Sequence, residues 1–268
     1  MCEPPMRPLA VLIVVSGMLV LSRSAQAQGP PPPIPFWAID VHATVPSFPD
    51  TPALAASRGL QVGELPGVAL GADIAMAFDH VVPGQASWEL AAEGMERTLR
   101  WLDRCKRRHE ELASESIVLP SQTLWPIIQG GSHDELRRRS LEGTLARGPW
   151  TGIAIGGLSV GEPKPVMHRV LEGLAPILPA EAPRYLMGVG FPDDLLEGIA
   201  RGVDLFDCVA ATRNGRHGSA WTSTGKVNIR AAPHRLSDAP LDADCDCETC
   251  QRFSRGYLRH LFMAEEML

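Results

Sequence analysis

The stretch Val203-Asp-Leu-Phe-Asp207 decides the fold, because it reads as a short buried strand that ends in a carboxylate. A carboxylate at the carboxyl end of a parallel strand lies where barrel enzymes carry their chemistry. Further apolar segments upstream also end in glycine or a polar residue: 73–79, 126–129, 152–157 and 184–188. We therefore expect an α/β protein whose parallel strands bring their polar ends to one face.

Helical patterns separate these segments. Apolar residues recur at helical spacing in 87–112, 132–146, 164–178 and 192–201, with Ser87 as a cap and Pro192 in a first turn. This alternation predicts crossover helices between parallel strands. It is compatible with both a (β/α) barrel and a doubly wound open sheet.

The N-terminus has a different character. Arg7 precedes the apolar run Leu9–Leu21, and the small-x-small triplet Ala25-Gln-Ala27 follows, which is typical of a secretory signal peptide. The run is short for a membrane span. Residues 29–70 are rich in proline, which indicates a linker or a poorly ordered segment.

Two polar clusters follow the decisive strand. Thr212-Arg-Asn-Gly-Arg-His-Gly218 reads as a glycine-bearing turn with two arginines, and Cys245, Cys247 and Cys250 place three sulfur ligands in a tight loop. The spacing C-x-C-x2-C predicts a metal site. Although the formal net charge of −6 does not indicate a nucleic-acid binder, a carboxylate, a cationic turn and a thiolate cluster suggest chemistry on an anionic polymer.

The cysteine cluster and the N-terminus point to different compartments. Clustered metal-binding cysteines are typical of a reducing compartment and favour the cytoplasm, whereas the signal-like residues 1–28 favour export. Either the export is real, or the N-terminal segment was joined to the rest by fusion or a misplaced gene start. We expect a cytoplasmic protein.

Seven motifs along the chain occur together in one family. They are Phe78-Asp79, Ile128-Gln129-Gly-Gly, Gly156-Gly-Leu-Ser-Val-Gly-Glu162, Tyr185-Leu-Met-Gly-Val-Gly190, Phe206-Asp-Cys-Val, Thr212-Arg-Asn-Gly-Arg and Cys245-Asp-Cys-Glu-Thr-Cys250. In this order they resemble the bacterial-type tRNA-guanine transglycosylases, or queuine tRNA-ribosyltransferases, from about residue 71 to the end. The resemblance implies a TIM-type (β/α)8 barrel with a zinc-binding insertion near its C-terminus.

That family exchanges the guanine at the anticodon wobble position of tRNA for a 7-deazaguanine base. The resemblance implies that Asp207 is the nucleophile, which attacks ribose C1′ and leaves a covalent RNA–enzyme intermediate. It also implies that Arg213 and Arg216 contact phosphates of the anticodon loop, and that the protein forms a homodimer. The base would be extruded from its stack.

The same resemblance implies the base pocket and the metal ligands. Asp79 would hold the N1/N2 edge of the purine, Gln129 and the Gly157 N–H would read its carbonyl oxygen, and Leu158 and Met187 would form apolar walls. The zinc ligands would be Cys245, Cys247 and Cys250. The resulting division is a signal-like segment 1–28, a proline-rich segment 29–70, a partial barrel 71–210, and an RNA-binding loop with the zinc subdomain in 211–268.

Two features of the family are not found in this sequence. These are a Ser-Asp-Ser-Gly-Gly-Phe-Gln segment with a second catalytic aspartate, and a downstream histidine that completes the zinc site; His260 is the only histidine after Cys250. We therefore expect a family member truncated at both ends, with about five of the eight strands of a full barrel.

Three functions remain open at this point. The first is base exchange on tRNA. The second is a catalytically inactive remnant or accessory RNA-binding subunit of the same family. The third is a periplasmic glycosidase in which Asp79 and Asp207 form an acid/base pair.

Overall fold

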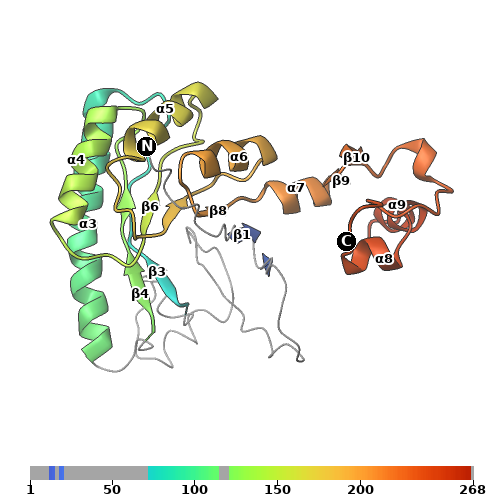
Figure 1. Ribbon diagram of the computed structural model, residues 1–268, viewed down its shortest axis with the longest axis horizontal. Helices are drawn as coiled ribbons and strands as arrows, with labels where there is room; N and C mark the ends of the chain where they lie inside the picture. The colour runs from blue at the N-terminus through green and yellow to red at the C-terminus, as the bar shows by residue number, and fades with distance from the viewer. Residues whose placement is uncertain (1–11, 16–17, 21–71, 115–120, 267–268) are drawn as a thin grey trace, which may run out of the picture. The chain divides into compact units, whose positions relative to one another are not determined.

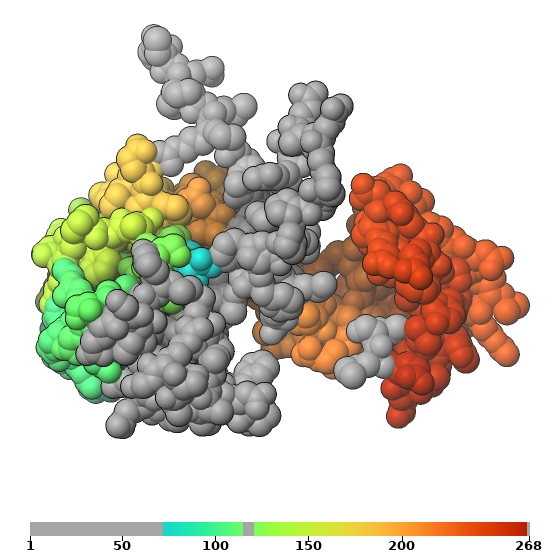
Figure 2. All heavy atoms as spheres, turned by 90° about the horizontal axis from the view of Figure 1, so that it is seen from below, coloured from blue at the N-terminus to red at the C-terminus, as the bar shows by residue number. Residues whose placement is uncertain are grey.

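The computed structural model describes residues 12–15, 18–20, 72–114 and 121–266 (Figure 1). The predicted proline-rich segment 29–70 and most of the signal-like segment 1–28 lie outside the described residues. The chain divides into two compact units, Met1–Cys208 and Val209–Leu268, which can be followed by residue number in Figure 2. This division falls close to the predicted boundary after residue 210.

The first unit is a mixed α/β structure with parallel strands. These are β3 (Ile74–Met76), β4 (Thr123–Trp125), β5 (Ile127–Ile128), β6 (Ile153–Ile155), β7 (Arg184–Leu186) and β8 (Leu205–Asp207). Strand β3 pairs with β4, β5 with β6, β6 with β7, and β7 with β8, all in parallel. From β5 to β8 each strand therefore pairs with the next one along the chain, while β3 and β4 form a separate two-stranded sheet.

The segment predicted as a strand at 126–129 contains β5 and is preceded by β4, a strand that was not predicted from the sequence. Only Pro126 separates β4 from β5, and proline lacks the N–H that would continue the ladder. Its carbonyl still accepts a hydrogen bond from the Ala154 N–H at 2.9 Å, while the Trp125 carbonyl accepts from the Ala77 N–H at 2.9 Å. Residues 123–128 thus link the β3 edge to β6.

Two short strands belong to the N-terminal apolar run. Strand β1 (Leu12–Val15) pairs in parallel with β8, and β2 (Met18–Val20) pairs antiparallel with β1. The larger sheet therefore runs in the order β2-β1-β8-β7-β6-β5. Within the described ranges, every helix is too short or too polar to cross a membrane.

The predicted helices are confirmed, with small shifts at their ends. They are α3 (Trp88–Ser114), α4 (Asp134–Leu145), α5 (Lys164–Leu174) and α6 (Pro192–Ala200). Ser87 Oγ accepts the Leu90 N–H at 3.3 Å and so caps α3, as predicted. Pro192 begins α6, where its missing N–H costs no helical bond.

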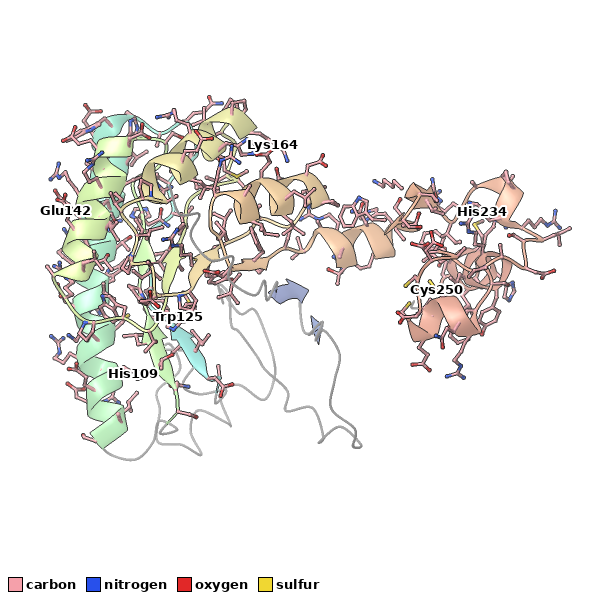
Figure 3. All side chains as sticks on the ribbon, in the orientation of Figure 1. His109, Trp125, Glu142, Lys164, His234 and Cys250 are labelled. Atoms are coloured by element: carbon pink, nitrogen blue, oxygen red, sulfur yellow. The ribbon has the colours of Figure 1, made fainter. Side chains whose placement is uncertain are left out.

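Both faces of the sheet are apolar. Ile128, Ile155, Leu186 and Phe206 pack with buried residues of α4 and α5, such as Leu171. The alternate strand positions face the other way and form a second cluster with Trp125: Ile127, Ala154, Tyr185 and Met187. Figure 3 shows Trp125 among the strands. Each fully buried large apolar side chain contributes about 1.5–3 kcal/mol, so this core dominates the stability of the first unit.

The second unit is small and rich in turns. It contains α7 (Ala210–Arg216), the hairpin β9 (Ser219–Thr222) and β10 (Gly225–Asn228), η1 (Ala232–His234), α8 (Glu248–Arg252) and α9 (Arg255–Met263). The prediction of a turn at 212–218 was wrong, because this segment lies mostly in α7. Helix α9 begins after Ser254, whose Oγ accepts the Tyr257 N–H at 3.2 Å.

Candidate active site

Asp207 ends β8, and two donors hold one of its oxygens. The Tyr185 hydroxyl donates to Oδ1 at 2.8 Å, and the Gly188 N–H donates to the same atom at 2.7 Å. Within the described residues nothing donates to Oδ2. The carboxylate is therefore fixed in orientation while one of its oxygens remains available to attack an electrophile.

The Tyr185 phenol acts as a permanent hydrogen-bond donor. Burial and then the charge of the neighbouring Asp207 raise the pKa of Tyr185 well above its ordinary value. Both causes disfavour the phenolate form. At neutral pH the phenol therefore keeps its proton and donates a hydrogen bond to the carboxylate.

Asp79 and Gln129 form a second polar group along the same edge. Gln129 follows β5 and Asp79 follows β3, and the Gln129 Nε2 donates to Asp79 Oδ2 at 2.5 Å. Gln129 is 1 % exposed, and its Oε1 accepts no hydrogen bond from the described residues. A buried polar atom without a partner indicates a place where a ligand or water binds.

Gly157 lies directly against this glutamine. A Cβ at Gly157 would stand 2.3 Å from Gln129 Oε1, and its φ of +64° is in the left-handed region that favours glycine. The Gly157 N–H is buried, and no described residue accepts its hydrogen bond. Gly157 therefore offers a second polar group without a described partner, next to Gln129.

Two buried polar residues of α4 hold these strand ends. The Ser140 hydroxyl accepts the Gln129 N–H at 3.1 Å. Arg137 is 1 % exposed and donates to carbonyl oxygens of both loops, those of Ile128, Gly131, Gly156 and Gly157. Burial lowers the pKa of Arg137 to about 10, which leaves the guanidinium charged at neutral pH.

The two predicted apolar walls belong to different clusters. Met187 is 5 % exposed and packs with Tyr185 and Trp125. Leu158 is 2 % exposed and packs instead into the cluster that contains Ile155 and Leu171. The structure thus brings Met187 toward the residues that hold Asp207, whereas the Leu158 side chain lies in the helix-side core.

In the second unit, the three predicted cysteines lie together. The sulfur atoms of Cys245, Cys247 and Cys250 all lie within 4.8 Å of one another, at the start of α8 (Figure 3). The Cys250 N–H is the main cause that lowers the pKa of the Cys247 thiol, while burial raises the pKa of Cys250 to about 11. Three converging sulfurs with backbone N–H donors fit a thiophilic metal ion.

Arg213 and Arg216 lie on one face of α7, since they are three residues apart in a helix. Both side chains are exposed, and neither forms an ion pair with the described residues of the chain. Their charges are therefore available to an anionic partner.

Comparison with known proteins identifies the family of this chain. The family model for queuine tRNA-ribosyltransferase matches residues 68–268, which cover every site residue described above. The chain belongs to the queuine tRNA-ribosyltransferase family.

Similar members of this family come from several bacteria. The queuine tRNA-ribosyltransferase of Herpetosiphon aurantiacus is 53% identical over 199 residues, which are 74% of this chain and 48% of the relative. The protein of that name from Azotobacter vinelandii is 51% identical over 199 residues, 74% of this chain and 51% of the relative. That of Desulforamulus reducens is 50% identical over 200 residues, 75% and 52% respectively. The chain spans about half the length of these curated relatives.

Sequence reasoning gave no role to three groups of this queuine tRNA-ribosyltransferase family member. These are the Tyr185 hydroxyl, the Gly188 N–H and Arg137. Tyr185 was detectable, because it alternates with Met187 on one face of a strand. Arg137 stands three and four residues before Ser140 and Leu141, which are both buried. Helical periodicity therefore places Arg137 on the buried face of α4.

Proposed function

We propose that this chain exchanges guanine at the anticodon wobble position of tRNA for a 7-deazaguanine base, with Asp207 as the covalent nucleophile. The observation that carries the proposal is the fixed carboxylate of Asp207, with Oδ1 held by Tyr185 and Gly188 and Oδ2 free of described donors. A nucleophile needs this combination of a fixed direction and an available lone pair.

The reaction would proceed in two displacements. Asp207 Oδ2 forms a bond to ribose C1′ while the bond between C1′ and guanine N9 breaks, and guanine leaves with the electron pair and takes up a proton from water. The incoming base then gives its N9 proton to the hydroxide left by that water, and N9 forms the new bond to C1′ as the bond between C1′ and Asp207 Oδ2 breaks. The two hydrogen bonds to Oδ1 also stabilise Asp207 as a leaving group in the second step.

The pair Asp79 and Gln129, together with Gly157, would recognise the base. Asp79 accepts from the N1–H and the exocyclic amino group of guanine, because a carboxylate offers two acceptor oxygens. The Gly157 N–H and the remaining hydrogen of the Gln129 amide donate to the carbonyl oxygen. Met187 would form an apolar wall, while the position of the Leu158 side chain gives less support to its proposed contact.

Arg213 and Arg216 would hold the RNA by its phosphates. Exposed arginines suit this role because the guanidinium offers paired donors to phosphate oxygens.

We further propose a homodimer that acts in the cytoplasm, with tRNA and a base such as preQ1 or queuine as its partners. Sedimentation with and without an anticodon stem-loop would measure the oligomeric state.

Zinc would be the metal held by Cys245, Cys247 and Cys250. It would neutralise the thiolates and cross-link the loop to α8, which is a structural role. The consecutive parallel pairing from β5 to β8, with α4 and α5 packed against one face, supports a (β/α) barrel rather than a doubly wound sheet, whose strand order reverses at a switch point.

Incorporation of isotopically labelled guanine into unmodified anticodon stem-loop RNA tests the proposal. The unsubstituted chain should incorporate label, and Asp207→Asn should reduce the rate by roughly 10⁴-fold or more, the order expected for loss of a nucleophile. Asp193→Asn is the matched control, because Asp193 is an exposed carboxylate in the first turn of α6.

Two outcomes would contradict the proposal. If the folded chain incorporates no label but retards the RNA on a native gel, the accessory RNA-binding alternative is favoured. If Asp207→Asn incorporates label as fast as Asp193→Asn, the role of Asp207 is wrong.

A further inference from the structure

Arg137 is a buried cation whose hydrogen-bond partners are all main-chain carbonyls. Its Nε donates to Gly131 O at 2.8 Å, its Nη1 to Ile128 O at 3.0 Å and to Gly156 O at 2.7 Å, and its Nη2 to Gly157 O at 3.1 Å. No described carboxylate pairs with it. Burying a charge costs free energy unless the charge is fully hydrogen-bonded. The buried position of Arg137 therefore indicates a role for its contacts with the two loops.

The carbonyls that Arg137 holds belong to the peptides that border the proposed base pocket. A trans peptide is planar, so its C=O and N–H point in opposite directions, and the described peptides contain no cis bond. Because the Gly156 carbonyl points to Arg137, the Gly157 N–H of the same peptide points away from it. That N–H is the one without a described acceptor.

The conformation of the loops follows from the same contacts. Gly131 and Gly157 have φ of +57° and +64°, and both turn their carbonyls toward the guanidinium. A side chain at either position would be strained in this conformation. Arg137 therefore holds the two Gly-Gly loops, 130–131 and 156–157, in their conformations through one set of hydrogen bonds.

The charge adds an electronic effect to the geometric one. A hydrogen bond from a guanidinium to a peptide oxygen polarises the peptide, and its N–H becomes a stronger donor. The Gly157 N–H would thus be both aimed and strengthened by a residue that never touches the base.

We propose that Arg137 is a positioning residue that sets the selectivity of the site for a base with a carbonyl oxygen, acting through the Gly156–Gly157 peptide. The inference rests on the proposed function and deepens it. It separates the recognition of the purine into two parts: Asp79 reads the N1/N2 edge directly, and Arg137 controls the donor that reads the carbonyl.

The test compares guanine with 6-thioguanine, which keeps the N1–H and the amino group but replaces the oxygen with sulfur, a weaker acceptor. The measured quantity is the ratio of kcat/KM for the two bases in one stem-loop RNA. Arg137→Lys keeps the charge but cannot reach four carbonyls. We expect it to lower the ratio about tenfold, the effect of losing one good hydrogen bond, with KM for the RNA unchanged.

Arg138→Lys is the matched control, because Arg138 neighbours Arg137 on α4 but is exposed; its ratio should equal that of the unsubstituted chain. An unchanged ratio in Arg137→Lys, with exchange intact, overturns this inference alone. No exchange by the unsubstituted chain overturns the proposed function and the inference with it. Arg137→Gln is measured in parallel, and if circular dichroism shows both variants unfolded, the role of Arg137 is purely structural and the inference is wrong.

Discussion

The two units of the chain are stabilised by different means. In the first unit, large apolar side chains fill clusters on both faces of the sheet. In the second, the buried apolar side chains among the described residues are Ala210, Ile229 and Cys250. Small units with so little apolar burial usually need a metal or a disulfide. From this comparison we expect the first unit to be stabilised by its own apolar core, and the second unit to depend on the proposed zinc.

Polar contacts in the second unit lead to the same conclusion. Arg255 donates to the carbonyls of Pro240 and Leu241, each at 2.9 Å, and the Asp242 carboxylate accepts from the Ser223 N–H and hydroxyl at 2.6 and 2.7 Å. Such exposed or half-buried hydrogen bonds fix the local conformation, but each adds little net stability. Removal of the metal should therefore have the largest effect.

We expect Cys250→Ser or a strong chelator to abolish amide-exchange protection in the second unit and to leave the first unit unchanged. Structural zinc contributes about 10–16 kcal/mol in isolated zinc fingers, more than a unit of this kind can replace. Hydrogen exchange with mass spectrometry measures both units in one sample. Cys105→Ala is the control, because Cys105 lies in α3 within an apolar cluster of the first unit, and its substitution should leave the metal content unchanged. Equal amide protection of the second unit with and without metal would contradict this prediction.

The reverse experiment weakens the first unit alone. Leu171 is 2 % exposed, and Leu171→Ala should lower the free energy of unfolding of this unit by about 2–5 kcal/mol. Leu196 is 70 % exposed, so Leu196→Ala should change it by less than about 0.5 kcal/mol. Denaturant titration measures both, and metal affinity should be the same in the two variants. A change in metal affinity in Leu171→Ala would show that the units are not independent.

A smaller effect is expected from the link between the hairpin and the cysteine loop. Asp242→Asn weakens the bonds to Ser223 and to the Asp244 N–H, and should lower metal affinity about tenfold, the lower end of the range for outer partners of metal ligands. Competition with a chromophoric chelator gives the affinity. Asp246→Asn removes the same charge from between two cysteines without breaking a described hydrogen bond; if it weakens binding as much, charge and not the link is responsible.

The smallest effect concerns a surface pair of the first unit. The Arg201 guanidinium donates to Glu197 and lowers the pKa of that carboxyl below its ordinary 4.5. Because the pKa of Glu197 is lower in the folded than in the unfolded chain, the ion pair adds to the free energy of unfolding above pH 4.5, and this contribution is lost as the pH falls through the folded pKa. Glu197→Gln should therefore have a slightly lower free energy of unfolding than the unsubstituted chain at pH 7, and the same value at pH 3, as measured by denaturant titration. Glu142→Gln, at an exposed carboxylate without a described ion pair, should show no such change (Figure 3).

Much of the first unit could be predicted from the sequence, because period-2 and helical patterns are local. The strands at 153–155 and 205–207 and the caps at Ser87 and Pro192 were found in this way. The α7 helix was not, because Asn214 and Gly215 are residues that favour turns, and contacts of the surrounding chain overrode that preference.

The candidate site was predictable in its residue types but not in its partners. Asp79, Gln129, Gly157 and Asp207 are recognisable as polar strand ends. That Gln129 bonds to Asp79, or that a tyrosine donates to Asp207, depends on which strands lie side by side, which no local pattern contains. Arg137 was missed because an arginine in a basic run is usually solvated.

Mapping of a trapped adduct tests whether Asp207 is the covalent nucleophile. The full chain is incubated with unmodified anticodon stem-loop RNA and 9-deazaguanine, resolved on a denaturing gel, digested and analysed by mass spectrometry. We expect a slower-migrating band whose ribonucleotide is attached to the peptide that contains Asp207, and loss of this band in Asp207→Asn. An adduct on another residue, or no adduct from folded protein that binds the RNA, would contradict it.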